Sequence, residues 1–341
     1  MMEIFLTLFF ITILLFFLGT GIWVAISMIG VSALGMMIFT SRPVGDAMAT
    51  TIWGTSSSWT LTALPLFVWM GEILFRTKLS ENLFEGLSPW MQKLPGGLIH
   101  VNVVGCALFA AISGSSAATV ATVGKMSIPE LRKRKYPEKI LLGSLAGSGT
   151  LGLLIPPSII LIIYGVTTQE SIAKLFIAGI LPGIMIALIF MSYVIIWSLI
   201  NKKEMPISYE NFSFLEKIKK SKQLLPVIIL ILAVIGSIYT GVATATEAAS
   251  LGVVGALIVS YFQKTLSLDT FKKSLLGATK TSCMIAFILA GSTFLSLAMG
   301  FTGLPRNLAI WIETMKFSPY FLIFVLMIFY IILGMFLDGI S

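Results

Sequence analysis

Long apolar runs alternate along this chain with short segments that are polar or rich in glycine. Runs of this kind predict membrane-spanning helices, which need about 20 apolar residues each. The segment from Arg42 to Ser58 is rich in threonine and serine and predicts a polar loop. The helix-forming runs cover residues 4–18, 22–39, about 60–75, 172–200, 224–240, 244–262 and 276–299.

Two shorter segments are amphipathic instead of uniformly apolar. In 80–93, Leu83, Leu87 and Trp90 recur at helical spacing between charged residues, and 302–315 resembles this pattern. Helices of this type lie in the membrane interface rather than across the membrane.

The stretch 98–124 has two apolar arms, each too short to cross a bilayer, on either side of Ser113-Gly114-Ser115-Ser116. A re-entrant helical hairpin, which reaches mid-membrane and returns, fits this length and composition. Irregular backbone is tolerated at that depth only where it is buried in protein or lines a polar cavity, so the tip is a candidate binding site. A helix pair packed closely through small residues is the alternative.

A second interruption divides the apolar stretch 140–165. Pro156 and Pro157 have no backbone N–H, which predicts a broken helix with free carbonyls at Gly152 and Leu153. Such carbonyls, with the serine hydroxyls of the hairpin tip, suit a hard cation such as Na⁺, while helix N-termini at the tip favour an anion such as a carboxylate. Discontinuous helices with a midplane site are typical of secondary transporters. A simple structural kink is the alternative.

Composition agrees with a polytopic membrane protein. The 341 residues are 57% hydrophobic and 11% charged, with a mean hydropathy of +0.98, whereas soluble domains have about 25% charged residues. The net charge of +8 therefore does not indicate nucleic-acid binding. Cys106 and Cys283 lie in apolar segments and His100 is the single histidine, so neither a disulfide framework nor a metal cluster is indicated. No phosphate-binding loop or hydrolase motif is present, which argues against an enzyme.

The basic residues predict an orientation. With the N-terminus outside and 98–124 entering and leaving on the inner side, 19 of the 23 Lys and Arg residues lie inside. The two densest groups are then the inner loops 125–139 and 201–222. A full crossing by 98–124 would separate 125–139 from the basic residues of 76–93, so the charge distribution favours the re-entrant hairpin. The four residues left outside are Arg42, Lys174, Arg306 and Lys316.

Most acidic residues in or near apolar segments have structural explanations. Glu72 precedes Arg76 by four residues, the spacing of a helical ion pair. Thr244 and Glu247 have the spacing of a capping box. Asp338 differs, because it follows an apolar arm, and intramembrane carboxylates are functional candidates.

The order of elements repeats. A helix, an amphipathic segment, an apolar arm and a small polar tip occur over 60–116 and again from 276 to the end of the sequence. The predicted topology starts the second copy from the opposite side, so the repeats are inverted. The predicted organisation is a first repeat at 1–200, a cytoplasmic basic loop at 201–222 and an incomplete second repeat at 223–341, whose second hairpin begins at 320–341 and whose remainder is cut off.

Four motifs in this order resemble the large membrane subunit of TRAP (tripartite ATP-independent periplasmic) transporters. The resemblance covers nearly the whole chain, except that the second Pro-Pro segment and the final helices of that family are absent. The motifs are Ser-Gly-Ser-Ser-Ala-Ala-Thr-Val-Ala-Thr-Val-Gly (113–124), Gly-Thr-Leu-Gly-Leu-Leu-Ile-Pro-Pro-Ser (149–158), Ala-Thr-Glu-Ala-Ala-Ser-Leu-Gly (245–252) and Leu-Gly-Met-Phe-Leu-Asp-Gly-Ile-Ser (333–341).

The resemblance implies a Na⁺-driven importer of an organic acid anion, such as a C4-dicarboxylate or a sugar acid, in the bacterial inner membrane. A periplasmic substrate-binding protein would deliver the anion, and a small four-helix membrane subunit would brace the large one. It also implies an elevator mechanism, in which a transport domain bearing both hairpins moves against scaffold helices at 4–39 and 224–262. The amphipathic segments 80–93 and 302–315 would be the arms that link the two.

Carried over by position, the resemblance also implies site residues, with Na⁺ as coupling ion and no other cofactor. The Na⁺ site would comprise Ser113, Ser116, Gly152, Ile155 and Pro157. The substrate-facing tips and the helix break would add Gly114, Ser115, Thr150, Pro156, Asp338 and Gly339.

Two other functions stay open at this point. A stand-alone Na⁺/dicarboxylate symporter of the related two-hairpin fold would need no binding protein. A non-transporting membrane scaffold or receptor would need no ion site at all.

Overall fold

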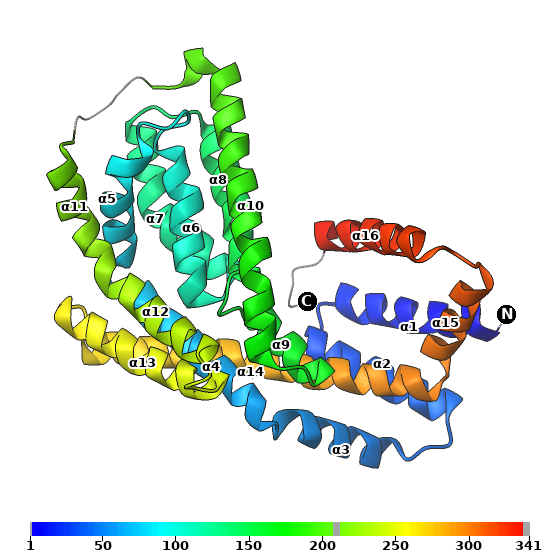
Figure 1. The fold of residues 1–341 in the computed structure, drawn as a ribbon. Helices are drawn as coiled ribbons and strands as arrows, with labels where there is room; N and C mark the ends of the chain where they lie inside the picture. The colour runs from blue at the N-terminus through cyan, green and yellow to red at the C-terminus, as the bar shows by residue number, and fades with distance from the viewer. Residues whose placement is uncertain (1, 207–211, 337–341) are drawn as a thin grey trace. The chain divides into compact units, whose positions relative to one another are not determined.

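A computed structural model describes residues 2–206 and 212–336, and every regular element within these ranges is helical (Figure 1). Four helical segments of the described residues are long and apolar enough to cross a membrane, or five if α3 and α4 form one span. The predicted class, an all-α polytopic membrane protein, is confirmed. The four segments are α10 (Ile172–Ile200), the run Phe214–Tyr239, α13 (Ala245–Phe262) and α14 (Leu268–Phe301).

The chain divides into two compact units, and α14 begins in one and ends in the other. The first unit combines the residues up to Trp59 with those from Cys283 onward. Its core includes the buried side chains of Met36, Phe294 and Ala298. Besides the end of α14, its helices are α1 (Met2–Gly19), α2 (Val24–Phe39), α3 (Val44–Ser56), α15 (Leu304–Thr314) and α16 (Pro319–Phe336).

The second unit, Thr60–Ser282, contains the hairpin and the broken helix. Within it α13 packs along α4, and the helices α6, α7 and α8 pack on one another with α5 against α6 and α7 (Figure 1). Its remaining α-helices are α4 (Ala63–Phe75), α5 (Leu79–Met91), α6 (Ile99–Ser113), α7 (Ser116–Lys133), α8 (Glu138–Gly149), α9 (Ile159–Thr168), α11 (Phe214–Ser221) and α12 (Leu225–Tyr239), and its 3₁₀ turns are η1 (Trp59–Thr62, which begins at the boundary), η2 (Thr150–Leu153), η3 (Lys202–Glu204) and η4 (Lys222–Leu224).

The expected polar loop between Arg42 and Ser58 is wrong, because most of it forms α3. Its threonines bond within the helix: the hydroxyl of Thr51 donates to the carbonyl of Ala47 at 2.6 Å and that of Thr55 to Thr51 at 2.9 Å. A threonine hydroxyl can donate to the backbone carbonyl one turn earlier in its own helix, so a segment rich in threonine can still be helical.

Both basic loops are also more helical than expected. Helix α7 extends into the expected loop 125–139 as far as Lys133, and Arg132 and Lys133 in its last turn complement the helix dipole. The expected loop 201–222 contains α11, which starts with a capping box between Ser213 and Glu216. Helix α14 begins at Leu268, before the expected run 276–299, so Lys272 and Lys273 lie on this helix.

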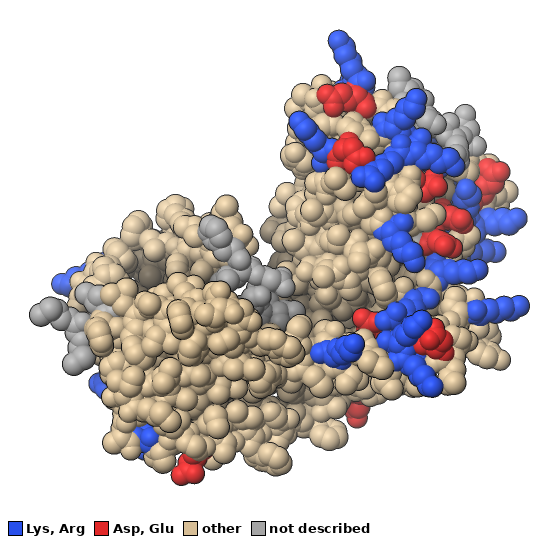
Figure 2. Space-filling view, turned by 180° about the vertical axis from the view of Figure 1, so that it is seen from behind, with Lys and Arg blue, Asp and Glu red and all other residues tan. Residues whose placement is uncertain are grey.

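Basic residues concentrate in the second unit. Only three of the 23 Lys and Arg residues, Arg42, Arg306 and Lys316, belong to the first unit. Figure 2 shows blue side chains gathered over the second unit, whereas the surface of the first unit on this face is mostly uncharged. The amphipathic segments 80–93 and 302–315 form α5 and α15. The inverted repeat and the scaffold formed by helices at 4–39 and 224–262 stay predictions.

Candidate functional site

The hairpin tip is a two-residue turn between α6 and α7. Gly114 ends α6 in the left-handed conformation, at φ 60°, and its N–H donates to the carbonyl of Ala110 at 3.1 Å. Glycine adopts this conformation without the penalty that a Cβ brings, so the sequence reverses here. Ser115 then caps α7, because its hydroxyl accepts from the N–H of Ala118 at 3.4 Å.

Hydroxyl groups hold the turn together. The hydroxyl of Ser113 lies 3.0 Å from that of Thr119, and the Thr119 hydroxyl donates to the carbonyl of Ser115 at 2.7 Å. Ser113 and Thr119 are buried, while Ser115 and Ser116 are half-buried. The tip therefore presents several oxygen atoms whose positions are fixed by contacts within the hairpin itself.

The broken helix consists of α8, the turn η2, an irregular segment Leu154–Ser158 and then α9. The N–H groups of Leu154 and Ile155 both donate to the carbonyl of Leu151, at 3.1 and 2.9 Å. Ser158 caps α9, and its hydroxyl donates to the carbonyl of Leu153. The expectation that Leu153 has a free carbonyl is therefore wrong, although a carbonyl with one donor retains a second lone pair.

The tip and the break are in direct backbone contact. The N–H of Ile159 donates to the carbonyl of Gly114 at 3.3 Å. A Cβ added to Gly114 would lie 2.6 Å from the carbonyl oxygen of Pro157, and one added to Gly152 would lie 2.8 Å from the carbonyl of Ser115. Only glycine permits this approach, so the two motifs are parts of one structure.

The electrostatics of this contact come from helix ends rather than from charged side chains. The N-termini of α7 and α9 and the C-terminus of α6 meet there, and helix ends carry partial charges of opposite sign. The sequence contains no Asp, Glu, Lys or Arg in 98–124 or 140–168. These two segments would contact a ligand held here through carbonyls, hydroxyls and N–H groups.

The structure brings most of the predicted site residues together and separates others. Thr150 is exposed, and its hydroxyl donates to the carbonyl of Gly147 in the preceding helix α8. The side chain of Ile155 lies against Gly183 of α10, and that of Pro156 is close to Gly179, so these two residues could contribute only backbone atoms. Asp338 and Gly339 lie outside the described residues. The residues that meet are Ser113, Gly114, Ser115, Ser116, Gly152 and Pro157.

The sequence reasoning missed three residues of this structure. Thr119 and Ser158 supply the hydroxyl contacts described above, and Gly71 of α4 lies against the tip, because a Cβ there would be 3.0 Å from the Cα of Ser113. The position of Thr119, one turn after the cap of α7, is a signal that could have found it. Nothing in the sequence near Gly71 indicates its partner.

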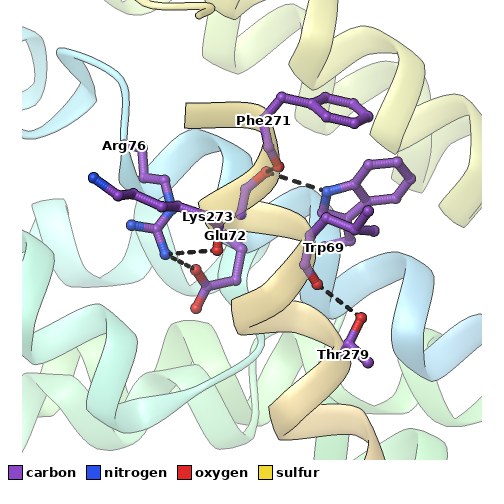
Figure 3. A network of polar contacts seen from close by, with 8 residues as sticks. Trp69, Glu72, Arg76, Phe271, Lys273 and Thr279 are labelled. Carbon is purple, nitrogen blue, oxygen red and sulfur yellow. Dashed lines mark hydrogen bonds and ion pairs between the residues drawn. The ribbon is translucent and has the colours of Figure 1, made fainter. Parts of the chain in front are cut away.

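Glu72 has the structural role that its spacing predicts. Arg76 donates from Nη2 to Glu72 at 2.7 Å and to the carbonyl of Lys273 at 3.2 Å, so the ion pair of α4 is also bonded to α14 (Figure 3). One turn earlier, the indole N–H of Trp69 donates to the hydroxyl of Ser274 at 3.3 Å. This network fixes α4 against the first part of α14.

The predicted capping box is confirmed, and the single histidine is also part of the structure. Thr244 and Glu247 form the capping box of α13, in which the backbone N–H of Thr244 donates to the carboxylate at 2.8 Å. His100 is buried, and its Nε2 lies 2.8 Å from the carbonyl of Pro95, so it packs inside the unit.

These features define a class. A polytopic helical protein in which a helix hairpin and a proline-broken helix meet through neutral backbone and hydroxyl groups has the architecture of secondary transporters. The comparison with known families then identifies the family. The chain belongs to the DctM component family of the tripartite ATP-independent periplasmic transporters, whose family model matches residues 11–341.

Individual relatives agree with this assignment. The chain is 33% identical over 307 residues to the C4-dicarboxylate TRAP transporter large permease protein DctM of Pseudomonas aeruginosa, covering 90% of this chain and 71% of that protein. It is 29% identical over 334 residues to the DctM protein of Rhodobacter capsulatus, covering 94% and 75%. It is 31% identical over 327 residues to the sialic acid TRAP transporter large permease protein SiaM of Vibrio cholerae, covering 95% and 75%. The predicted family is confirmed, and it consists of transporter components rather than enzymes.

Proposed function

We propose that this chain is the large permease of a Na⁺-coupled TRAP transporter that imports an organic acid anion. The observation that carries the proposal is the contact between the hairpin tip and the proline break, where Gly114 and Gly152 allow backbone groups of both motifs to meet. Backbone carbonyls at helix C-termini and serine hydroxyls suit Na⁺, which needs oxygen ligands but no formal charge.

The same contact supports an anionic substrate. The N-termini of α7 and α9 converge on it, and their N–H groups and dipoles favour negative charge. The relatives' names include C4-dicarboxylate and sialic acid, which are both carboxylates. An organic acid anion, such as a C4-dicarboxylate or a sugar acid, is therefore the substrate class we propose.

The partners, the location and the movement that we propose are those expected for a member of this family. We propose a periplasmic binding protein that delivers the anion, a small four-helix membrane subunit, and a bacterial inner-membrane location with a periplasmic N-terminus. The hairpin 98–124 would be re-entrant, and the tip and break would move together in an elevator mechanism. The dense basic segments 125–139 and 201–222 support this orientation, because cytoplasmic segments of membrane proteins are enriched in Lys and Arg.

Uptake into proteoliposomes tests the proposal. The protein would be reconstituted with its small membrane subunit, and labelled C4-dicarboxylates and sugar acids would be added with and without the binding protein, under an inward Na⁺ or K⁺ gradient. We expect uptake only with both the binding protein and the Na⁺ gradient. Equal uptake in K⁺ would refute Na⁺ coupling, and uptake without the binding protein would favour the stand-alone symporter.

A further inference from the structure

Helix α11 has an exposed apolar face that nothing in the transport site uses. Phe214 is 67% exposed, Leu215 78% and Ile218 41%. The helix lies at the start of the apolar run Phe214–Tyr239, which is one of the candidate membrane spans. In the same run, beyond the turn η4, Leu225 and Ile229 of α12 are also apolar and exposed. Exposed apolar residues therefore extend from α11 into α12.

The length of this run places α11 at the membrane surface. A helix of 26 residues is about 39 Å long, whereas the hydrocarbon core is about 30 Å thick. From Leu224 onward the run is apolar except for Ser237, and all of its Lys residues lie before that point, at Lys217, Lys219, Lys220 and Lys222. The first turns therefore lie at the depth of the lipid headgroups.

The lysines of α11 divide into two groups. Lys217 lies over the ring of Trp90, at 5.3 Å, and Lys220 over that of Phe212, at 4.2 Å. Lys219 and Lys222 are exposed beside the apolar face, and neither is in an ion pair with any residue that the structure describes. An apolar face bordered by lysines is the pattern of helices that bind anionic lipid surfaces.

Helix α11 is also attached to the amphipathic helix α5. The indole N–H of Trp90 donates to the hydroxyl of Ser221 at 2.8 Å, and the amide of Gln223 donates to the carboxylate of Glu85 at 3.0 Å. The ring of Phe214 packs edge-on against that of Trp90, with centroids 6.3 Å apart. A lipid that holds α11 at the membrane surface therefore also holds α5.

We propose that α11 is a binding surface for anionic phospholipid, in which Phe214, Leu215 and Ile218 enter the acyl region while Lys219 and Lys222 contact headgroup phosphates. The surface anchors α5, through Trp90, at a fixed depth in the membrane. This inference does not depend on the proposed Na⁺ coupling or on the substrate.

The test measures lipid binding directly. The purified full chain in detergent would be titrated with phosphatidylglycerol that carries pyrene on an acyl chain, and energy transfer from tryptophan to pyrene would report binding. The variant Lys219→Gln/Lys222→Gln should bind about 30-fold more weakly, since each surface lysine contributes about 1 kcal/mol, or about fivefold. The matched control is Lys202→Gln/Lys203→Gln, which removes the same charge from η3, and it should bind as the unmodified protein does.

A second variant tests the apolar contribution without changing charge. Leu215→Asn should weaken phosphatidylglycerol binding about tenfold, because the leucine side chain no longer enters the acyl region and about 1.4 kcal/mol of apolar contact with lipid is lost. Its side chain is exposed, so the fold does not depend on it. An equal loss in the control pair, no loss in Leu215→Asn, or equally tight binding of pyrene-labelled phosphatidylcholine would each overturn the proposal.

Discussion

Replacing Gly152 with alanine tests the contact between the hairpin tip and the proline break. The added Cβ would lie 2.8 Å from the carbonyl carbon and oxygen of Ser115 and 3.0 Å from the nitrogen of Ser116. All three are backbone atoms in a turn held by its own hydrogen bonds, so the tip and the break must move apart. Overpacking of this kind costs about 1–3 kcal/mol.

Gly143 of α8 offers a matched control. A Cβ at Gly143 meets no atom within 4 Å, so alanine there is free of clashes. Because alanine favours a helix over glycine by about 1 kcal/mol, Gly143→Ala should stabilise the protein slightly.

The assay is thermal unfolding of the purified protein in detergent, followed by tryptophan fluorescence. We expect Gly152→Ala to lower the midpoint temperature of unfolding by about 2–6 °C, while Gly143→Ala leaves this temperature unchanged or raises it. If the two variants unfolded at the same temperature, the close approach of tip and break would be wrong.

Three further predictions use the same unfolding assay. Thr244→Ala removes the cap of α13 and should cost about 1 kcal/mol, whereas no change would argue against the capping box. Gly277→Ala brings a Cβ within 2.6 Å of a carboxylate oxygen of Glu72, but that oxygen ends a flexible side chain, so the loss should stay below about 1 kcal/mol. Arg132 donates two hydrogen bonds to Glu138 and lowers the pKa of that carboxyl below its usual 4.5, so the pair stabilises the protein above this pH. Glu138→Gln should therefore lower the midpoint at pH 7, and the difference from the unmodified protein should vanish as the pH falls below 4.5.

The sequence was sufficient to predict features that depend on local chemistry. The apolar runs predicted helices, four of which are long and apolar enough to cross a membrane, or five if α3 and α4 form one span. Gly114 and the serines predicted the turn, and the paired prolines predicted the break. The ion pair of Glu72 and the cap at Thr244 follow from spacing along one helix. Each of these is determined by residues close to one another in the sequence.

The rest depended on contacts between distant segments or on competition between polar groups. The approach of Gly71 to Ser113 and of Gly152 to Ser115 involves helices that are separate in the sequence. The carbonyl of Leu153 was expected to be free because Pro157 has no backbone N–H to donate to it. The hydroxyl of Ser158 donates to this carbonyl instead. Helix α3 was missed because threonine was taken as a loop residue, although its hydroxyl can bond within a helix.

The central claim is that the tip and the break together bind Na⁺, and ligand-induced stabilisation measures this directly. The unfolding midpoint of the purified protein would be recorded in increasing NaCl, with KCl added to hold ionic strength constant. At a Na⁺ concentration about 100 times the Kd, bound Na⁺ should stabilise the protein by about 2.7 kcal/mol. The unfolding midpoint should rise with Na⁺ in the unmodified protein but not in Gly152→Ala. An unfolding midpoint that is the same in NaCl and KCl, or a rise that persists in Gly152→Ala, would contradict this claim.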